Sequence, residues 1–484
     1  MVTLRIIDHV NCCFEGLTSN ELKHCQKAVS YPIPGAFMTA AVKGGFSDGR
    51  ESLLSDDGFT YIYMIDHLLT IMEEELEMDI DSMELVVESE PFELNVPLVD
   101  EDWLIDELGY KLREHQVEAI NAGVFHKKGI FDLATNAGKT AICLGMSKLL
   151  DPFIKTVVIV PSEKLCNQTY ADYAKSNLNV LHLTKKIKPK DREKKIREAR
   201  HVIITLGLFQ NCFKYFHEQY AIIQDECHIF GDVTAEILRF EMSHCPIRLG
   251  FTGTVPKDKL KSQKLKSTIG GGILGKVSPD ELITNGFASQ ITIELFTTSH
   301  NEIEHHIMEM ANDREFEAID VYDTEENYLS TNVHRVQAIY DFIKSLETKN
   351  TLVLCNPRLG NRLASIDGNP YIDEDTSTDE RERLFQGFRS SDEWVVWASY
   401  GTSSTGISED RIFRLILIDV GKNETQILQS IGRLLRLDGV HNSAEVIDIS
   451  ADTKYSKKHR EERLKIYRRE KFPYTQNENF IMVG

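Results

Sequence analysis

The spacing of apolar and polar residues changes at about residue 100. Beyond it, helical segments alternate with short, nearly continuous apolar runs, which are typical of strands buried on both faces. Strand and helix alternation indicates a parallel α/β sheet. The runs form a first series, which comprises 129–134, 156–161, 201–205, 220–225 and 247–252, and a second series, which comprises 290–296, 350–355, 393–399, 413–419 and 444–450.

The first hundred residues follow another pattern. Short apolar runs are broken by turns at 32–35, 43–50 and 55–59, and a helical pattern follows at about 62–77. The predicted fold class is therefore α/β, with two tandem parallel-sheet domains preceded by a small α+β N-terminal domain. The predicted domains span 1–95, 96–288 and 289–484, and the last ends in a basic C-terminal tail.

Charge is placed unevenly along the chain. The net charge of −20 argues against a protein that coats nucleic acid without discrimination. Residues 73–93 are strongly acidic, whereas residues 185–200, 257–266 and 454–471 are basic. Local basic surfaces on an acidic chain fit a protein that grips phosphates in one groove only.

The cysteines and the apolar runs indicate a cellular compartment. Nine cysteines occur without a C-x-x-C pair, which predicts reduced, buried thiols and neither disulfides nor a zinc site. No run of about 18 apolar residues exists, so no membrane span is expected. We also expect no signal peptide and a cytoplasmic protein.

A candidate phosphate-binding loop lies in the stretch FDLATNAGKT at 131–140, between a predicted strand and a predicted helix. Backbone N–H groups at a helix N-terminus bind anions. Gly138 permits close approach of the backbone, Lys139 can reach the β and γ phosphates, and Thr140 can ligate Mg²⁺. The stretch alone also fits an ordinary helix start.

Two residues of this stretch depart from the usual loop patterns. Leu133 and Asn136 stand where those patterns have glycine. Asparagine tolerates a left-handed backbone better than most residues do, so we expect Asn136 to replace a glycine. We expect Leu133 to complete the strand.

Adjacent carboxylates follow the apolar run at 220–225. Asp225 can hold Mg²⁺, and Glu226 can orient or deprotonate an attacking water. A zinc site at Cys227 and His228 is disfavoured, because adjacent residues on a strand point to opposite faces. The loop and these carboxylates together predict an ATPase.

The sequence DECH at 225–228 resembles motif II of the superfamily 2 helicases, and the other motifs follow in order. This resemblance implies RecA-like domains, the cofactors ATP and Mg²⁺, adenine recognition by Gln116 near Arg113, and coupling of hydrolysis to movement by Thr252 and Thr254. It further implies nucleotide contacts from Thr135, Asn136, Ala137, His228, Gly406 and Gln429, and nucleic-acid contacts from Pro161, Ser162, Thr205 and Thr405.

The stretch QILQSIGRLLR at 426–436 resembles motif VI of the same superfamily. If this stretch is helical, Arg433 and Arg436 share a face. We expect both to point toward the γ-phosphate held by the first α/β domain, where arginine stabilises the charge of phosphoryl transfer. Opening and closing of the two domains would then move the protein along a strand.

The loop form, DECH and ASYGTSSTGIS at 398–408 are similar to those of the phage UvsW-type helicases, which are branch-migrating DNA helicases of superfamily 2. The resemblance spans about 100–450 and extends more faintly into the N-terminal domain. There Lys43, Phe46 and Arg50 are candidate DNA contacts, with a purely structural hairpin as the alternative.

This resemblance implies ATP-driven remodelling of branched DNA in recombination, repair and replication, in the host cytoplasm of an infected bacterium. The expected partners are single-stranded and branched duplex DNA, with RNA in R-loops as a further substrate, and the expected acting form is a monomer. Three alternatives stay open: an RNA helicase, an ATP-gated DNA clamp that displaces no strand, and a small-molecule P-loop kinase. The basic segment 454–471 is either a DNA-contacting helix or a solvated one.

Overall fold

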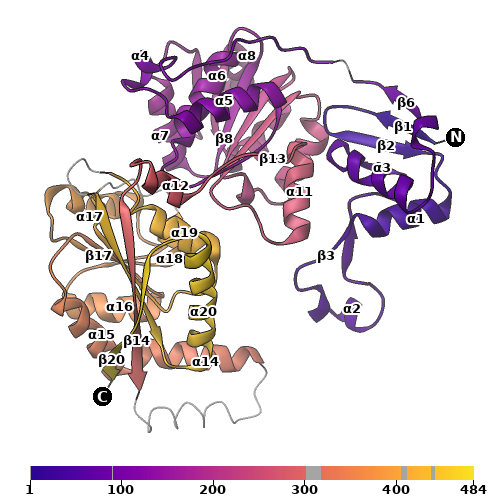
Figure 1. Ribbon diagram of the computed structural model, residues 1–484. Coiled ribbons are helices and arrows are strands. Elements are labelled where there is room, and N and C mark those ends of the chain that lie inside the picture. Colours follow the sequence, from indigo (N-terminus) through magenta and orange to yellow (C-terminus); the bar gives the residue numbers. More distant parts are fainter. Residues whose placement is uncertain (1, 90, 301–317, 405–410, 438–441, 484) are drawn as a thin grey trace. The chain divides into compact units, whose positions relative to one another are not determined.

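A computed structural model describes residues 2–89, 91–300, 318–404, 411–437 and 442–483 (Figure 1). The chain divides into two compact units. One contains residues 1–133 and 138–277, and the other contains residues 278–484 together with the short segment 134–137. Each unit holds a seven-stranded parallel sheet, so the predicted pair of tandem α/β domains is confirmed.

The sheet of the first unit has the order β13-β7-β12-β11-β8-β10-β9. All five predicted strands are present, and the chain adds two weaker ones, β9 (Val180–Leu183) and β13 (Ile273–Val277). The remaining strands are β7 (Lys128–Leu133), β8 (Lys155–Val160), β10 (His201–Thr205), β11 (Tyr220–Asp225) and β12 (Ile247–Thr252). The helices are α4 (Ile105–Leu108), α5 (Glu114–His126), α6 (Lys139–Leu150), α7 (Glu163–Tyr173), α8 (Pro189–Glu198), α9 (Leu206–Cys212), α10 (Asp232–Glu236) and α11 (Lys259–Ile269).

The N-terminal domain belongs to this same unit. Its mixed sheet has the order β5-β2-β1-β6, and a two-stranded arm, β3 with β4, carries the short helix α2. The elements are β1 (Thr3–Ile6), β2 (Asn11–Glu15), α1 (Ser19–Ala28), β3 (Ser30–Pro32), α2 (Ala40–Lys43), β4 (Arg50–Ser52), β5 (Phe59–Tyr61), α3 (Ile65–Glu74) and β6 (Glu84–Val87).

A few specific contacts fix the N-terminal domain to the first α/β sheet. The Arg239 guanidinium lies 3.8 Å from the centre of the Tyr61 ring and donates a 2.8 Å hydrogen bond to the side chain of Asn11. The Asn11 amide returns a 3.0 Å bond to the Arg239 carbonyl. Leu260 of α11 is buried in the N-terminal core. The N-terminal domain and this sheet therefore form one packed body.

A buried arginine holds together the elements around β12. Arg248 is fully buried, and burial lowers its pKa to about 10, so it stays charged at neutral pH. Its guanidinium donates to the carbonyls of Leu238, Met242 and Thr268 at 2.8–3.1 Å. Arg248 thus ties the segment after β11 and the end of α11 to the sheet.

We expect Arg248→Met to destabilise the first unit by about 3–5 kcal/mol, because three buried carbonyls lose their donor. Urea unfolding measures the loss. The matched variant Arg192→Met, at a partly exposed arginine, should cost about 1 kcal/mol or less. Equal costs for the two variants would show that Arg248 adds nothing beyond ordinary packing.

The second unit has a parallel sheet in the order β16-β17-β15-β18-β19-β14-β20. Its predicted strands are present, and β16 and β20 are additional. The strands are β14 (Gln290–His300), β15 (Thr351–Leu354), β16 (Tyr371–Ile372), β17 (Val395–Ala398), β18 (Arg414–Ile418), β19 (Ser443–Ala451) and β20 (Tyr474–Val483). The helices are α12 (Pro279–Thr284), α14 (Ala318–Thr331), α15 (Val333–Ser345), α16 (Pro357–Asp367), α17 (Thr378–Ser390), α18 (Tyr400–Ser404), α19 (Glu424–Gly432) and α20 (Lys454–Arg469).

The basic C-terminal segment is a helix, as the sequence predicted, and it is followed by a strand that the sequence did not predict. The basic residues form α20, and β20 then pairs with β14 as an edge strand of the sheet. Arg463 of α20 is buried and makes two 2.8 Å hydrogen bonds to the Asp448 carboxylate on β19. A buried, doubly bonded ion pair fixes this helix to the sheet.

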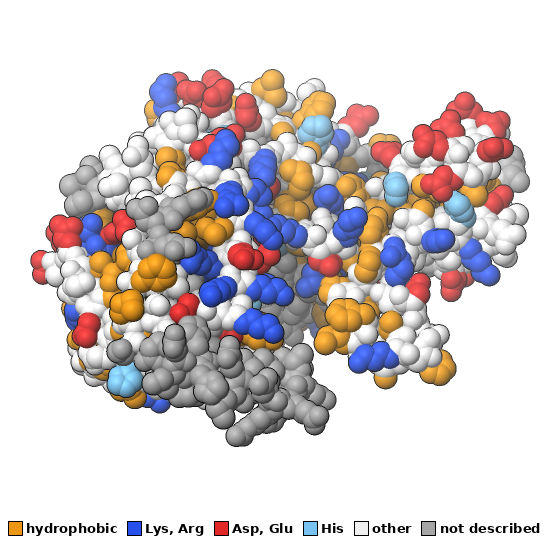
Figure 2. Space-filling view, turned by 60° about the horizontal axis from the view of Figure 1, so that its bottom comes forward, with side chains coloured by type: hydrophobic (Ala, Val, Ile, Leu, Met, Phe, Trp, Pro, Cys, Tyr) orange, Lys and Arg blue, Asp and Glu red, His pale blue; other side chains and the backbone are white. Residues whose placement is uncertain are grey.

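The cysteines, the longest apolar helices and the surface charges were also subjects of expectations from the sequence. All nine cysteines are free and buried, as predicted. No helix in the described part of the chain is long and apolar enough to cross a membrane. Lys and Arg side chains gather near the middle of the face shown in Figure 2, with a few acidic side chains among them.

Candidate active site

Neighbouring strands of the first sheet deliver the predicted nucleotide-binding residues to one edge. Strand β12 lies between β7 and β11, and all three run parallel. The phosphate loop follows β7, Thr252 ends β12, and Asp225 ends β11. Parallel open sheets bind ligands at the carboxyl ends of their strands. The structure therefore brings together the loop, the DECH residues and the TGT residues at 252–254, which the sequence predicted from separate segments.

The unusual residues of the loop behave as predicted. Asn136 has φ 74°, the left-handed conformation that a glycine would otherwise supply. Leu133 is the last residue of β7 and is 1% exposed, so it completes the strand. Thr135 and Ala137 flank Asn136 in the loop, and Thr140 is in the first turn of α6. Both departures from the usual pattern are accommodated.

The position of Gly138 requires a glycine for two reasons. Its φ is 82°, and a Cβ atom there would lie 2.0 Å from Nε2 of Gln116. Gln116 is 1% exposed, and its Oε1 accepts a 2.9 Å hydrogen bond from the backbone N–H of Arg113. The glutamine expected to recognise adenine therefore packs directly on the phosphate loop.

An ion pair connects the loop to the strand-end carboxylates. Lys139 Nζ lies 2.6 Å from Oε1 of Glu226, and both side chains are largely buried. Burial by itself lowers the pKa of Lys139, but the carboxylates of Glu226 and Asp225 outweigh it and raise that pKa. Burial raises the pKa of Glu226, but the charge of Lys139 outweighs it and lowers that pKa. The lysine is held charged beside a charged glutamate.

Asp225 differs from Glu226 in its electrostatics. Burial raises the pKa of Asp225, the charge of Glu226 raises it further, and Lys139 opposes both. Glu226 itself has φ 50°, a strained conformation for a residue with a side chain. A second cation at this edge would relieve the repulsion between the two carboxylates.

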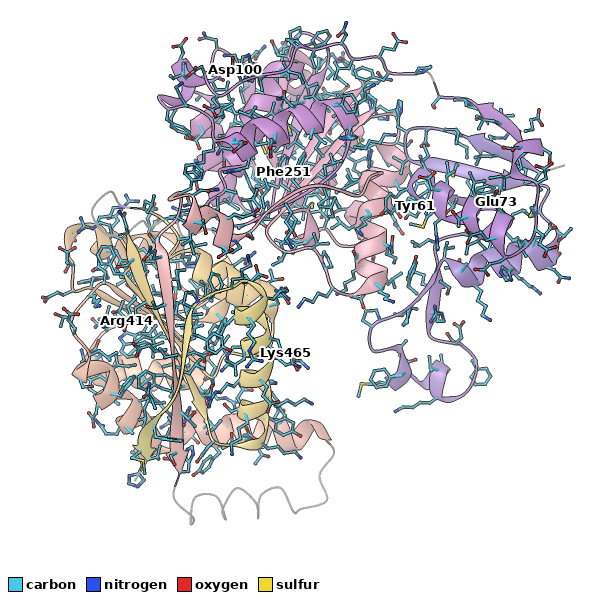
Figure 3. All side chains as sticks on the ribbon, viewed as in Figure 1. Tyr61, Glu73, Asp100, Phe251, Arg414 and Lys465 are labelled. Atoms are coloured by element: carbon cyan, nitrogen blue, oxygen red, sulfur yellow. The ribbon has the colours of Figure 1, made fainter. Side chains whose placement is uncertain are left out.

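A polar contact and then a hydrogen-bonded chain lead from Glu226 to the end of β12. Nδ1 of His228 lies 3.4 Å from Oε2 of Glu226 and 2.7 Å from Oγ1 of Thr252. That hydroxyl donates to the Thr254 carbonyl at 3.0 Å and accepts from the Thr254 N–H, also at 3.0 Å. A change at Glu226 therefore reaches the TGT turn through direct contacts (the strand is marked by Phe251 in Figure 3).

The residues present fit ATP with Mg²⁺. Among the described residues, Oε2 of Glu226 and Oγ1 of Thr254 are buried without a hydrogen-bond partner. Thr140 and Asp225 supply the oxygen donors that Mg²⁺ prefers, and the N-terminus of α6 with Lys139 supplies positive charge for phosphates. When bound, the metal would neutralise phosphate charge beside Asp225.

The expected nucleic-acid contacts of the first unit lie at neighbouring strand ends. Pro161 and Ser162 follow β8, and Ser162 caps α7 by accepting a 3.3 Å hydrogen bond from Leu165 N–H. Thr205 ends β10 and precedes α9. These three residues are half-buried, at the same edge of the sheet as the nucleotide residues.

The prediction for the arginines of motif VI needs a correction. Helix α19 ends at Gly432, so Arg433 lies in the turn that follows, Arg436 lies just beyond that turn, and the two do not share a helical face. Arg433 is buried and Arg436 is half-buried. Gln429 lies within α19, as expected. Thr405 and Gly406 lie outside the described residues.

The N-terminal candidates lie on the arm. Phe46 is 90% exposed, and Lys43, the last residue of α2, is also exposed. The Arg50 guanidinium donates to the carbonyl of Ser30 across the β3–β4 pair. The arm also exposes Phe37 and Met38, which the sequence analysis did not single out. Large apolar side chains exposed at the end of an arm are candidates for contact with a partner, and only the structure shows that these two are exposed.

Thr252 offers a test of the hydrogen-bonded chain. We expect Thr252→Val to keep ATP hydrolysis within a few-fold while strand displacement falls at least about tenfold, because the hydroxyl joins His228 to Thr254. ATPase and displacement assays run in parallel measure the ratio. The matched variant Thr252→Ser keeps the hydroxyl and should keep the ratio. Parallel loss of both activities in Thr252→Val would contradict a coupling role.

Comparison with known proteins gives consistent matches. The family model "Type III restriction enzyme, res subunit" matches residues 109–257. The ATP-dependent DNA helicase uvsW of Enterobacteria phage T4 is 24% identical over 401 residues, which are 74% of this chain and 76% of that protein. The DNA 3'-5' translocase XPB2 of Sulfurisphaera tokodaii is 23% identical over 426 residues, 80% of this chain and 90% of that protein. The DNA-bound ATP-dependent Type ISP restriction-modification enzyme LlaBIII shares the fold over 85% of this chain and 34% of its own, with a TM-score of 0.56 at 12% identity.

Proposed function

We propose that this chain, which is a UvsW-type helicase of superfamily 2 and an ATP-dependent enzyme, remodels branched DNA by moving along it. The substrates would be four-way junctions and stalled forks, with R-loops as a further class. Such an activity serves recombination, repair and replication.

One observation carries the proposal: the contacts that run from Lys139 through Glu226 and His228 to Thr252. An enzyme that only binds ATP needs the phosphate loop and no such connection. A motor must transmit the state of the phosphate to a part that moves. The contacts, 2.6 Å from Lys139 to Glu226, 3.4 Å from Glu226 to His228 and 2.7 Å from His228 to Thr252, support that transmission.

The residues of the first unit have distinct roles in this proposal. Lys139 holds phosphate charge, and Glu226 orients the attacking water and accepts its proton. His228 contacts both Glu226 and Thr252 and so would hold their side chains in fixed relative positions. If Lys139 turned from Glu226 to a bound phosphate, Glu226 would be free to hold a water molecule. The hydrogen bond between His228 and Thr252 would then transmit the change at Glu226 to the end of β12.

DNA contacts are the second part of the proposal. Ser162 and Thr205 would hold the backbone of one strand at the sheet edge, while the exposed Phe46 would stack on a base and Lys43 and Arg50 would contact phosphates. Phe46 suits stacking because 90% of its surface is open to a partner. The N-terminal arm would follow the first sheet, since Arg239 fixes that domain to it.

The test is ATP hydrolysis measured with single-stranded, duplex, forked and four-way DNA and with RNA, with strand displacement scored in parallel. We expect stimulation by DNA and displacement on branched substrates. Hydrolysis at the same rate with and without DNA would contradict the proposal that the protein is a translocase. Hydrolysis without displacement would favour an ATP-gated clamp, and preferential stimulation by RNA would favour an RNA helicase.

A further inference from the structure

The exposed face of α20 carries lysines that make no ion pair in the described structure. These are Lys454, Lys457 and Lys458, which are all exposed. Lys422, in the turn before α19, is also exposed and unpaired among the described residues. By contrast, Lys465 pairs with Glu462 at 2.7 Å, and Lys471 with Asp280 at 2.8 Å. We call Lys422, Lys454, Lys457 and Lys458 the lysine face.

The members of the lysine face lie close together. Lys454, Lys457 and Lys458 are spaced three and four residues apart, which places them on one side of the helix. Lys422 lies near them, because it and Lys458 both affect the pKa values of His459 and Glu462. Burial lowers the pKa of His459, and the charges of these two lysines lower it further. Figure 3 labels Lys465 on α20, the helix that carries three of these lysines.

The helix that presents this face is rigidly held. Arg463 and Tyr467 are buried on the opposite side and both bond to Asp448, at 2.8 Å and 2.9 Å. The buried carboxylate of Glu325 accepts from the backbone N–H groups of Tyr455 and Ser456 at 3.1 Å and 3.0 Å, so it closes the N-terminus of α20 from α14. The lysines therefore project from a fixed support.

We propose that the lysine face binds the phosphate backbone of duplex DNA. This inference rests on the proposed function and names a surface through which the second unit would hold the duplex part of a branched substrate. On a chain of net charge −20, these four ammonium groups gather without an ion pair among the described residues, and the Tyr455 ring lies 5.5 Å from the Lys454 ammonium. Counterion release on phosphate binding rewards such an arrangement.

The chemistry of the surface favours a duplex over a single strand. Single-strand sites combine positive charge with open aromatic platforms. Here the half-buried Tyr455 ring meets the Tyr322 ring edge to face at 5.5 Å, and the Lys454 ammonium lies 5.5 Å from its centre, so Tyr455 is not an open platform. Lys454 and Lys458, one turn apart, are separated along the axis by about 6 Å. Lysines on a rigidly held helix match the fixed phosphates of a duplex better than they match the phosphates of a flexible single strand.

The test replaces all four residues, as Lys422→Gln, Lys454→Gln, Lys457→Gln and Lys458→Gln in one variant. Binding of the full-length protein to blunt duplex, four-way DNA and single-stranded DNA is measured over a range of salt concentrations. We expect duplex and junction affinity to fall at least about tenfold at low salt. For duplex DNA, the slope of log binding constant against log salt concentration should become less negative by roughly 0.9 for each phosphate contact that is lost. Single-strand affinity and single-strand-stimulated ATP hydrolysis should stay within about twofold.

A control variant removes the same charge from the first unit, as Lys186→Gln, Lys188→Gln, Lys190→Gln and Lys195→Gln, all at exposed positions. An equal loss of duplex binding in this control would overturn the inference, because net charge alone would then explain the effect. Unchanged duplex binding in the lysine-face variant, or an equal loss of single-strand binding, would also overturn it. Failure of the unmodified protein to respond to any DNA would instead count against the proposed function.

Discussion

Replacing Lys139 with alanine should lower ATP hydrolysis by roughly 10²–10³-fold or more, as expected when a group that stabilises developing phosphate charge is removed. Lys139 is buried 2.6 Å from Glu226, and it also offsets the charge of Asp225. Its loss would leave two carboxylates facing each other in a buried site. Steady-state ATPase assays measure the effect, and retention of activity within tenfold would contradict the assignment.

A second variant separates chemistry from stability. Lys139→Ala alone should also lower the free energy of unfolding by about 3–5 kcal/mol, because Glu226 stays buried without its partner. Lys139→Ala combined with Glu226→Gln removes that uncompensated charge and should recover most of the stability. It should remain inactive. Recovery of hydrolysis in the double variant would show that Lys139 has only a structural role.

Replacing Arg436 with alanine should lower the turnover of ATP by roughly 10³–10⁵-fold while ATP binding changes little, as expected of an arginine that acts on phosphoryl transfer. Arg436 is the cleaner choice of the two arginines, because Arg433 is buried and its replacement also disturbs packing. Turnover is measured at saturating ATP, and affinity is measured by binding of a fluorescent nucleotide.

The control for Arg436 is lysine. Arg436→Lys keeps the charge but loses the planar, two-pronged donor, so it should recover only part of the turnover. Full turnover in Arg436→Ala would remove this residue from the proposed mechanism. Weakened nucleotide binding with unchanged turnover would instead assign Arg436 a binding role. Thermal unfolding of each variant confirms that the fold is retained.

The phosphate loop shows what the sequence predicts well. The chemistry of Asn136 was predictable because few residues besides glycine tolerate a left-handed backbone, and its φ is 74°. Leu133 was predictable because it lies in the apolar run 129–134, which is long enough for a buried strand. Parallel strands then bring Asp225 and Thr252 to the loop without further information, because their carboxyl ends share one edge.

Other features depended on contacts that no local pattern encodes. Helical spacing suggested that Arg433 and Arg436 share a face, but α19 ends at Gly432, before either residue. The packing of the basic helix α20 on the sheet was not predictable, because the partner of Arg463, Asp448, precedes it by 15 residues on another element. The docking of Arg239 on Asn11 spans 228 residues, and nothing in either neighbourhood points to the other.

The central claim is that ATP hydrolysis drives movement on branched DNA, and a four-way junction with homologous arms tests it most directly. The junction is labelled on two arms, and the appearance of the two linear duplexes is followed over time. We predict rapid, complete conversion with ATP and Mg²⁺, and none with a non-hydrolysable analogue or with Lys139→Ala. Conversion at the same rate without hydrolysis, or an intact junction despite DNA-stimulated hydrolysis, would contradict the account.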